Sequence, residues 1–251
     1  MSWLKGLPVV ATSALLLLPA TTAWAEVKPH GAPGLNWAGP AGASGSVPWN
    51  IVVLLTLLTL LPALVVALTP FARLLVVFHF LRQALGTQTA PSNQTLIGLS
   101  LVLTYFLMQP VGAQIYQQAV VPFQGGQIDA WAAIEQGTPP LRHFMLKFAR
   151  EKDLALFLEL AAAPRPARPE DVPMRVVVPA YILSELKTGF QIGAALFLPF
   201  LVIDMVVAAI TTSIGMMQLP PVVISTPLKI MLFVMIDGWH LLVGSLMKSF
   251  A

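Results

Sequence analysis

The sequence contains no cysteine, which excludes disulfide bonds, a nucleophilic thiol and any cysteine-ligated metal. Its four histidines (His30, His79, His143 and His240) are scattered and form neither an HExxH motif nor comparable ligand spacing. No serine lies in a G-x-S-x-G context, and no glycine-rich phosphate-binding loop precedes a lysine. The sequence therefore predicts that the chain is not an enzyme and carries no metal or cofactor.

Charged residues are also scarce. They make up 10% of the 251 residues, whereas hydrophobic residues make up 57%; soluble domains carry about 25% charged residues. The formal net charge is only +3, and no basic cluster or stripe stands out, so a nucleic-acid partner is not indicated. This composition predicts a membrane protein.

Residues 1–25 have the pattern of a secretory signal peptide. Lys5 gives a positive start, an apolar core runs from Val9 to Leu18, and Ala23-Trp24-Ala25 is a small-x-small cleavage site. The alternative is an uncleaved first membrane helix, but the apolar stretch is short against the roughly 20 residues that a span needs. Residues 26–48 are rich in Gly, Pro, Ala and Ser, which predicts a flexible periplasmic leader.

The remaining chain predicts an all-α, membrane-associated protein in three parts. Residues 49–109 form N-terminal hydrophobic helices, including a short span over Gln94 to Met108. Residues 110–175 hold more than half of the charges and form an extracytoplasmic helical insertion, with an amphipathic helix from about Leu141 to Ala162. Residues 176–251 form a hairpin of two apolar segments, Phe190 to Ile214 and Val222 to Met247.

Ionisable residues in the C-terminal hairpin are the strongest sign of function. Glu185, Lys187, Asp204, Lys229 and Asp237 lie in or beside segments that are otherwise apolar enough for a bilayer, where such groups normally face protein or a water-filled cavity. Glu185 and Lys187 are two residues apart, so they point to different faces of a helix and need partners on separate elements or chains. Structural pairing is the favoured interpretation, and a proton relay through the acids is the alternative.

Two other patterns suggest how the hairpin is built. Gly189 and Gly193 have the G-x-x-x-G spacing that lets helices approach closely. Met216, Met217 and Gln218 form an uncharged turn between the two apolar segments. Methionine adapts to irregular surroundings, so the turn suits either ordinary packing or a hydrophobic constriction that must seal and stretch.

Four runs in the sequence closely resemble the FliP family, the core export-gate proteins of flagellar type III secretion, which have homologues in virulence injectisomes. These runs are FLRQALGTQTAPSNQTLIGLSLVLTYFLMQP, PAYILSELKTGFQIG, PFLVIDMVV and SIGMMQLPPVVISTPLKIMLFVMIDGW. The resemblance covers roughly residues 49–250. It implies a protein-export channel that serves flagellum biogenesis, with a flagellar rather than injectisome role favoured by the pattern.

The resemblance also implies partners and a location. FliP-like subunits form a homo-oligomer, a pentamer, with FliQ-like and FliR-like chains in a helical pore complex, alongside FlhB-like and FlhA-like export components and the basal-body ring. The complex belongs to the bacterial inner membrane and the flagellar basal body, with much of the chain on the periplasmic side. Its substrates are unfolded export proteins.

Residue roles follow from the same resemblance. Met216, Met217 and Gln218 correspond to the pore gasket, although relatives commonly have a third methionine at the position of Gln218. The resemblance implies intersubunit polar contacts for seven residues: Arg82, Gln83, Glu185, Lys187, Asp204, Lys229 and Asp237. An ion or proton channel subunit that uses Glu185 and Asp204 is the alternative function, and a pure scaffold is a third.

Overall fold

A computed structural model describes residues 49–162, 166, 168–216 and 220–250. The predicted signal peptide (1–25) and leader (26–48) lie outside the described residues, as do Met217 and Gln218. The chain divides into two units, residues 1–52 and 53–251. Helix α1 begins in the first unit, and the cores and ion pairs described below belong to the second.

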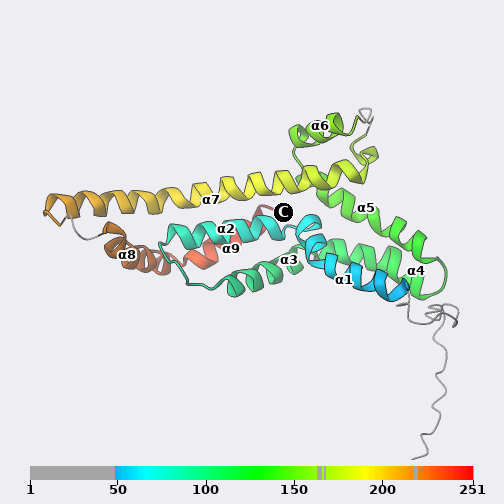
Figure 1. Ribbon diagram of the computed structural model, residues 1–251, viewed down its shortest axis with the longest axis horizontal. Coiled ribbons are helices and arrows are strands. Elements are labelled where there is room, and N and C mark those ends of the chain that lie inside the picture. The colour runs from blue at the N-terminus through cyan, green and yellow to red at the C-terminus, as the bar shows by residue number, and fades with distance from the viewer. Residues whose placement is uncertain (1–48, 163–165, 167, 217–219, 251) are drawn as a thin grey trace, which may run out of the picture. The chain divides into compact units, whose positions relative to one another are not determined.

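The described residues are helical, with no β-strand among them, which confirms the predicted all-α class. Figure 1 shows the helices in order along the chain. Their bounds are α1 Trp49–Leu68, α2 Phe71–Ala84, α3 Asn93–Ile115, α4 Val121–Gln124, α5 Ala130–Phe148, α6 Glu151–Leu160, α7 Met174–Ser213, α8 Pro221–Met235 and α9 Gly238–Lys248. A π-helical turn, Tyr116–Val120, joins α3 to α4, and a 3₁₀ turn, Pro169–Asp171, precedes α7.

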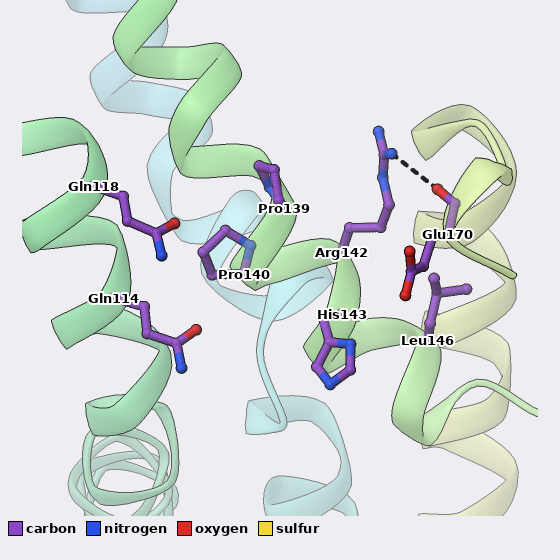
Figure 2. Close-up of a pocket in the computed structure, with 8 residues that line it drawn as sticks. All are labelled: Gln114, Gln118, Pro139, Pro140, Arg142, His143, Leu146 and Glu170. Atoms are coloured by element: carbon purple, nitrogen blue, oxygen red, sulfur yellow. Dashed lines mark hydrogen bonds between the residues drawn. The ribbon is translucent and has the colours of Figure 1, made fainter.

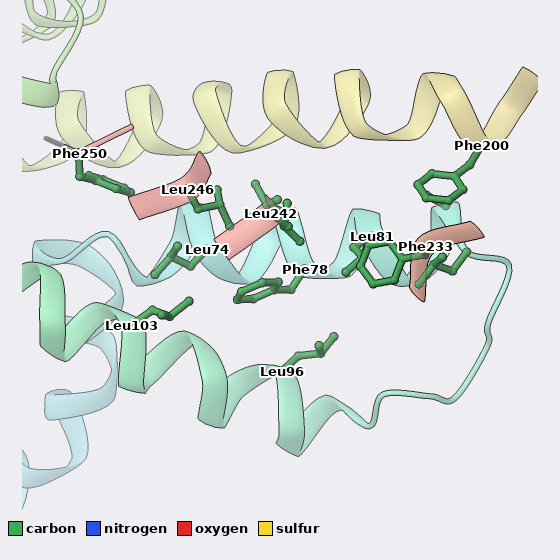
Figure 3. Packing of buried hydrophobic residues seen from close by; sticks show 13 residues of the cluster. Leu74, Phe78, Leu81, Leu96, Leu103, Phe200, Phe233, Leu242, Leu246 and Phe250 are labelled. Carbon is green, nitrogen blue, oxygen red and sulfur yellow. The ribbon is translucent and has the colours of Figure 1, made fainter. Parts of the chain in front are cut away.

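Helix α2 is the centre of the main hydrophobic core. It lies along α7 (Figure 1) and buries one face against α3, α7, α8 and α9. Leu74, Phe78 and Leu81 of α2 are fully buried. Figure 3 shows them surrounded by apolar side chains from the neighbouring helices. Phe250, just beyond α9, closes one end of this core. Within the predicted N-terminal hydrophobic helices (49–109), α2 is therefore a core helix.

A second, smaller core joins α5 and α6 to the beginning of α7. Met145 of α5 and Val176, Val177 and Tyr181 of α7 are fully buried there. Phe144 packs edge-to-face against Tyr181 with ring centroids 6.1 Å apart. The predicted insertion thus packs directly on α7.

Three helical stretches are long and apolar enough to cross a membrane: Ile51–Leu68, Asn93–Gln124 and Met174–Ser213. The α8–α9 pair, which is bent by 66°, makes up to four if it is counted as one broken span. With 40 residues, α7 is about 60 Å long at 1.5 Å per residue, roughly twice the ~30 Å hydrocarbon core. One α7 helix therefore combines a membrane-length segment with a comparable length beyond it.

The structure corrects the predicted limits of the second span. The short span over Gln94 to Met108 is wrong, because α3 continues through Pro110 and the helical run extends to Gln124. A proline inside a helix removes one backbone hydrogen bond but need not end the helix when the following residues remain helical. The boundary predicted at residue 110 thus falls within a helix, and that at residue 175 falls within the first turn of α7.

The structure also divides two predicted helices at positions where no proline occurs. The amphipathic helix predicted from Leu141 to Ala162 is two helices, α5 and α6, because the Arg150 backbone N–H donates to Ser184 Oγ of α7 at 2.9 Å. The segment predicted from Val222 to Met247 is broken at Asp237, whose φ of 51° is left-handed. A Cβ on the next residue, Gly238, would lie 2.3 Å from the Phe233 ring, so this turn requires glycine.

Candidate functional site

Three ion pairs fix α7 to three different helices. Glu185 pairs with Arg73 of α2, Lys187 with Asp153 of α6, and Asp204 with Lys229 of α8. The structure therefore supplies partners for all four predicted α7 and α8 charges within one chain, which differs from the expectation that neighbouring subunits provide them. The packing of α2, α6 and α8 against α7 brings the charged groups of each pair together within one chain. Any further intersubunit contact of these groups stays a prediction.

The Arg73–Glu185 pair is the most deeply buried of the three. The two side chains are 4% and 1% exposed, and an Arg73 Nη2 N–H donates to Glu185 Oε1. The guanidinium also lies 3.9 Å from the centroid of the Phe250 ring, a cation–π distance, and donates to Ser249 Oγ at 3.3 Å. The end of the described chain thus covers the ion pair between α2 and α7.

Lys187 takes part in a polar network that attaches α6 to α7. Its Nζ and the Ser184 hydroxyl both donate to Asp153, which is 1% exposed. Burial raises the pKa of Asp153, but these two hydrogen bonds and the charges of Lys187 and Arg150 outweigh it and hold the pKa below its usual range. Asp153 is therefore ionised at neutral pH. Glu185 and Lys187 thus pair with residues on two different helices, α2 and α6.

The third pair joins α7, α8 and the end of α2. Lys229 is 2% exposed; its Nζ donates to Asp204 Oδ2 at 2.5 Å and to the backbone oxygen of Ala84 at 3.0 Å. The Ser225 hydroxyl donates to Asp204 Oδ1 at 2.6 Å. The buried Lys229 ammonium therefore has two hydrogen-bond acceptors, one of which carries the opposite charge. This junction closes the α7–α8 hairpin on the core side.

Beyond this junction the hairpin end is uncharged. No Asp, Glu, Lys, Arg or His occurs between Asp204 and Lys229. Apolar side chains on both sides of the turn are nevertheless more than half exposed in the single chain, namely Val206, Ile210, Ile214, Val222 and Val223. Gly215 turns the chain with a φ of +83°, and Met216, next to it, is 42% exposed. An exposed apolar surface of this kind indicates contact with other chains or lipid.

Gly189 and Gly193 lie where α7 packs directly against α2. A Cβ on Gly189 would lie 3.3 Å from Val76, and a Cβ on Gly193 would lie 2.5 Å from the Phe80 ring. Phe80 is itself held by an edge-to-face contact with Phe190, at 5.5 Å between centroids. The small-residue stripe therefore faces α2 of the same chain.

The remaining predicted contact residues lie apart from the α7 ion pairs. Arg82 is partly buried and donates to Asn93 Oδ1 at 2.6 Å and to His79 Nδ1 at 3.1 Å. Burial and the Arg82 charge together lower the pKa of His79, which suits a neutral, hydrogen-bonded ring. Gln83 and Asp237 are exposed. Their predicted intersubunit contacts stay predictions.

Sequence reasoning missed Arg73, Asp153 and Ser225 as partners. Arg73 lies in an apolar run that gives no sign of a partner, and Asp153 lies in a predicted amphipathic helix whose acids are expected on the solvated side. A serine four residues after the start of a helix, such as Ser225 in α8, carries no distinctive signal. Among the described residues no group of three or more His, Cys, Asp or Glu side chains could hold a metal ion.

The fold and the site define an all-helical membrane protein whose longest helix is fixed by buried ion pairs and ends in an uncharged, apolar hairpin. The chain belongs to the FliP family, whose model matches residues 54–246. The family is one of structural components rather than enzymes, in agreement with the sequence.

Several relatives carry the name flagellar biosynthetic protein FliP. The protein of Pectobacterium carotovorum is 50% identical over 237 residues, covering 94% of this chain and 90% of that protein. The protein of Bacillus subtilis is 46% identical over 211 residues, covering 84% and 95%, and that of Caulobacter vibrioides is 42% identical over 242 residues, covering 96% and 89%.

Proposed function

We propose that this chain is a subunit of the flagellar protein export apparatus and forms the wall and the constriction of a conduit for unfolded proteins. The relatives' shared name supports a role in flagellum biosynthesis. The observation that carries the conduit proposal is the α7–α8 hairpin end, which is free of charge and apolar although its side chains are exposed in the single chain.

The distribution of charge explains why this hairpin suits a conduit. The cation and the anion that flank the uncharged segment, Lys229 and Asp204, neutralise each other at the core end. The segment beyond them can then be buried among neighbouring subunits without desolvating an unpaired charge. Several such hairpins converging on one axis would form a narrow apolar ring.

The turn itself supplies the seal in this proposal. Met216 is partly exposed beside Gly215, and Met217 and Gln218, which lie outside the described residues, complete the gasket that the family resemblance implies. Flexible methionine side chains can close on one another and yield to a passing chain. Gln218 would add one polar ring to the constriction.

The proposal includes an assembly and a location. The chain forms a homo-oligomer, a pentamer, with FliQ-like and FliR-like subunits, next to FlhB-like and FlhA-like components within the basal-body ring. Its apolar helices support a location at the inner membrane. The insertion between α3 and α7 lies on the periplasmic side, and part of the length of α7 extends beyond the bilayer.

An ion or proton channel that uses Glu185 and Asp204 gains no support from the geometry. Each acid has a buried cationic partner, Arg73 or Lys229, within hydrogen-bonding distance. An acid that carries protons through a membrane protein has to change its charge during transport, whereas these acids neutralise buried cations. The ion pairs therefore support a structural role for both acids.

The seal is tested by replacing Met216 and Met217 together with alanine. We expect increased leakage of ions across the membrane of cells that carry the variant, because truncation widens the ring while the helices that position it are unchanged. Ion leakage and swimming motility are measured, and assembly of the complex is checked by native mass spectrometry.

The matched control replaces Met231 and Met235 with alanine. These residues are 56% and 78% exposed on α8 and are away from the turn, so the control removes the same atoms without touching the constriction. Leakage and motility that stay normal in the Met216/Met217 variant, with the complex assembled, would contradict the gasket and assign these residues to ordinary packing.

A further inference from the structure

Met216 lies just beyond α7, where the helix ends in a hydrogen-bonded cap. The Gly215 N–H donates to the backbone oxygen of Thr212, and the Met216 N–H donates to that of Thr211, each at 3.0 Å. Together with the φ of +83° at Gly215, these two bonds form a Schellman motif, a common end of an α-helix. The backbone that carries the Met216 thioether is therefore fixed to the end of α7.

The Met216 side chain is accessible. It is 42% exposed, and a Cβ at Gly215 would have no atom within 4 Å, so the turn is open on that side. The Thr212 and Ser213 hydroxyls donate to backbone oxygens one turn earlier in α7, each at 2.8 Å. These hydroxyls are satisfied within the helix and contribute no free donor to the surface around Met216.

The composition of the chain makes its thioethers the targets of peroxide. Peroxides oxidise cysteine thiolates and methionine thioethers, and this chain has ten methionines and no cysteine. The sulfur lone pair of methionine attacks one peroxide oxygen, so an S–O bond forms while the O–O bond breaks. The sulfur loses two electrons, and the leaving hydroxide takes the proton of the transferred oxygen and departs as water. The product, methionine sulfoxide, is polar where the thioether was apolar.

A pocket beside α5 offers no comparable target. Figure 2 shows Gln114 and Gln118 facing Pro140 and His143 of α5 across a pocket of about 430 Å³. The side chains that line this pocket carry nitrogen and oxygen but no sulfur. The pocket therefore lacks both the thiol and the thioether on which peroxide acts.

The position of Met216 distinguishes it from the other methionines. Met205, Met231 and Met235 are 56–78% exposed, but they lie within α7 and α8, whereas Met145 is fully buried. A seal between two aqueous compartments has water on both sides, so its side chains meet dissolved peroxide in the assembled complex. A hydrophobic constriction closes by excluding water. A sulfoxide at Met216 would place a strong hydrogen-bond acceptor at that point.

We propose that Met216 is a site of reversible oxidation, at which a hydroperoxide converts the thioether to the sulfoxide and opens the constriction to water and ions. Reduction by a thiol-dependent methionine sulfoxide reductase restores the seal. In that step two thiols of the reductase are oxidised to a disulfide, and the sulfoxide oxygen leaves as water. The inference rests on the proposed function, because the constriction is the site that is modified.

The test measures the ion conductance of the assembled complex in a planar lipid bilayer before and after treatment with hydrogen peroxide. Met217→Leu is present throughout, so that Met216 is the only thioether of the turn. Each complex serves as its own reference, because the ratio of the two conductances is compared. Peptide mass spectrometry reports the oxygen added at Met216, and the buried Met145 gives the background of the same chain.

We expect peroxide to raise the conductance at least about fivefold, because a polar ring no longer excludes water, and methionine sulfoxide reductase to reverse the rise. Met216→Leu should abolish the response, since leucine has a similar volume and no sulfur. The matched control, Met235→Leu, removes a more exposed thioether from α8 and should leave the response unchanged.

Three results would overturn the inference: sulfoxide at Met216 without a change in conductance, no more oxidation at Met216 than at Met145, or an equal response in the Met216→Leu complex. These failures are distinct from failure of the proposed function. If replacing Met216 and Met217 with alanine causes leakage but the sulfoxide does not, the constriction stands and the oxidation site alone is wrong. If the alanine variant does not leak, the constriction itself is wrong.

Discussion

Replacing Arg73 with methionine should destabilise the folded chain by about 3–5 kcal/mol, the cost of leaving one partner of a buried ion pair without its counter-charge. Glu185 is 1% exposed and Arg73 is its ionic partner in the described structure, so its carboxylate would remain in the core between α2 and α7. The midpoint of thermal unfolding of the purified chain in detergent measures the loss.

A double variant separates the charge from the packing. Arg73→Met combined with Glu185→Leu removes both charges and should recover most of the lost stability, because an apolar pair of similar size can replace a buried ion pair. Arg82→Met is the control, since Arg82 lies on the same helix but is only partly buried, and it should cost less than about 1 kcal/mol. A double variant as unstable as Arg73→Met would contradict this explanation and assign the effect to the contacts of Arg73 with Phe250 and Ser249.

Enlarging Gly193 should separate α7 from α2. A Cβ at this position would lie 2.5 Å from the Phe80 ring, which is itself held against Phe190, so Gly193→Leu has to move a ring or a helix. Overpacking of a core contact costs about 1–3 kcal/mol. We expect a lower unfolding midpoint and reduced recovery of the assembled complex.

Two further variants check the cause of this effect. Phe80→Ala should partly rescue Gly193→Leu by vacating the space that the new side chain needs. Gly112→Ala on α3 is the control, because no atom lies within 4 Å of a Cβ there and alanine favours a helix by up to about 1 kcal/mol. Gly193→Leu with normal stability and assembly would show that α7 does not depend on close contact with α2.

The sequence identified the charged residues of α7 that need partners, but it did not identify the partners. The two-residue spacing of Glu185 and Lys187 correctly required partners on different elements, and the structure places them on α2 and α6. The partners themselves could not be predicted, because one sequence contains no information on which distant residues come together. Arg73 lies in an apolar run, and Asp153 is buried on a helix whose other acids, such as Glu151 and Glu159, are exposed.

Helix limits were predicted least well, and for a physical reason. The second span was predicted to end at Met108 and the amphipathic helix to begin at about Leu141, yet α3 passes through Pro110 and α5 through Pro139 and Pro140. The actual breaks at Arg150 and Asp237 depend on tertiary contacts, namely the hydrogen bond to Ser184 and the packing of Gly238 on Phe233. Local propensity cannot show such contacts, because packing overrides it.

The conduit proposal is tested most directly by asking whether an exported chain passes Met216. The naturally cysteine-free chain carries Met216→Cys, and an export substrate with one cysteine is arrested during transit by a folded C-terminal fusion. Mild oxidation should then link the substrate to residue 216, whereas Lys147→Cys on α5 should give no such product. A motile strain with an assembled complex and no cross-link at residue 216 would contradict the conduit.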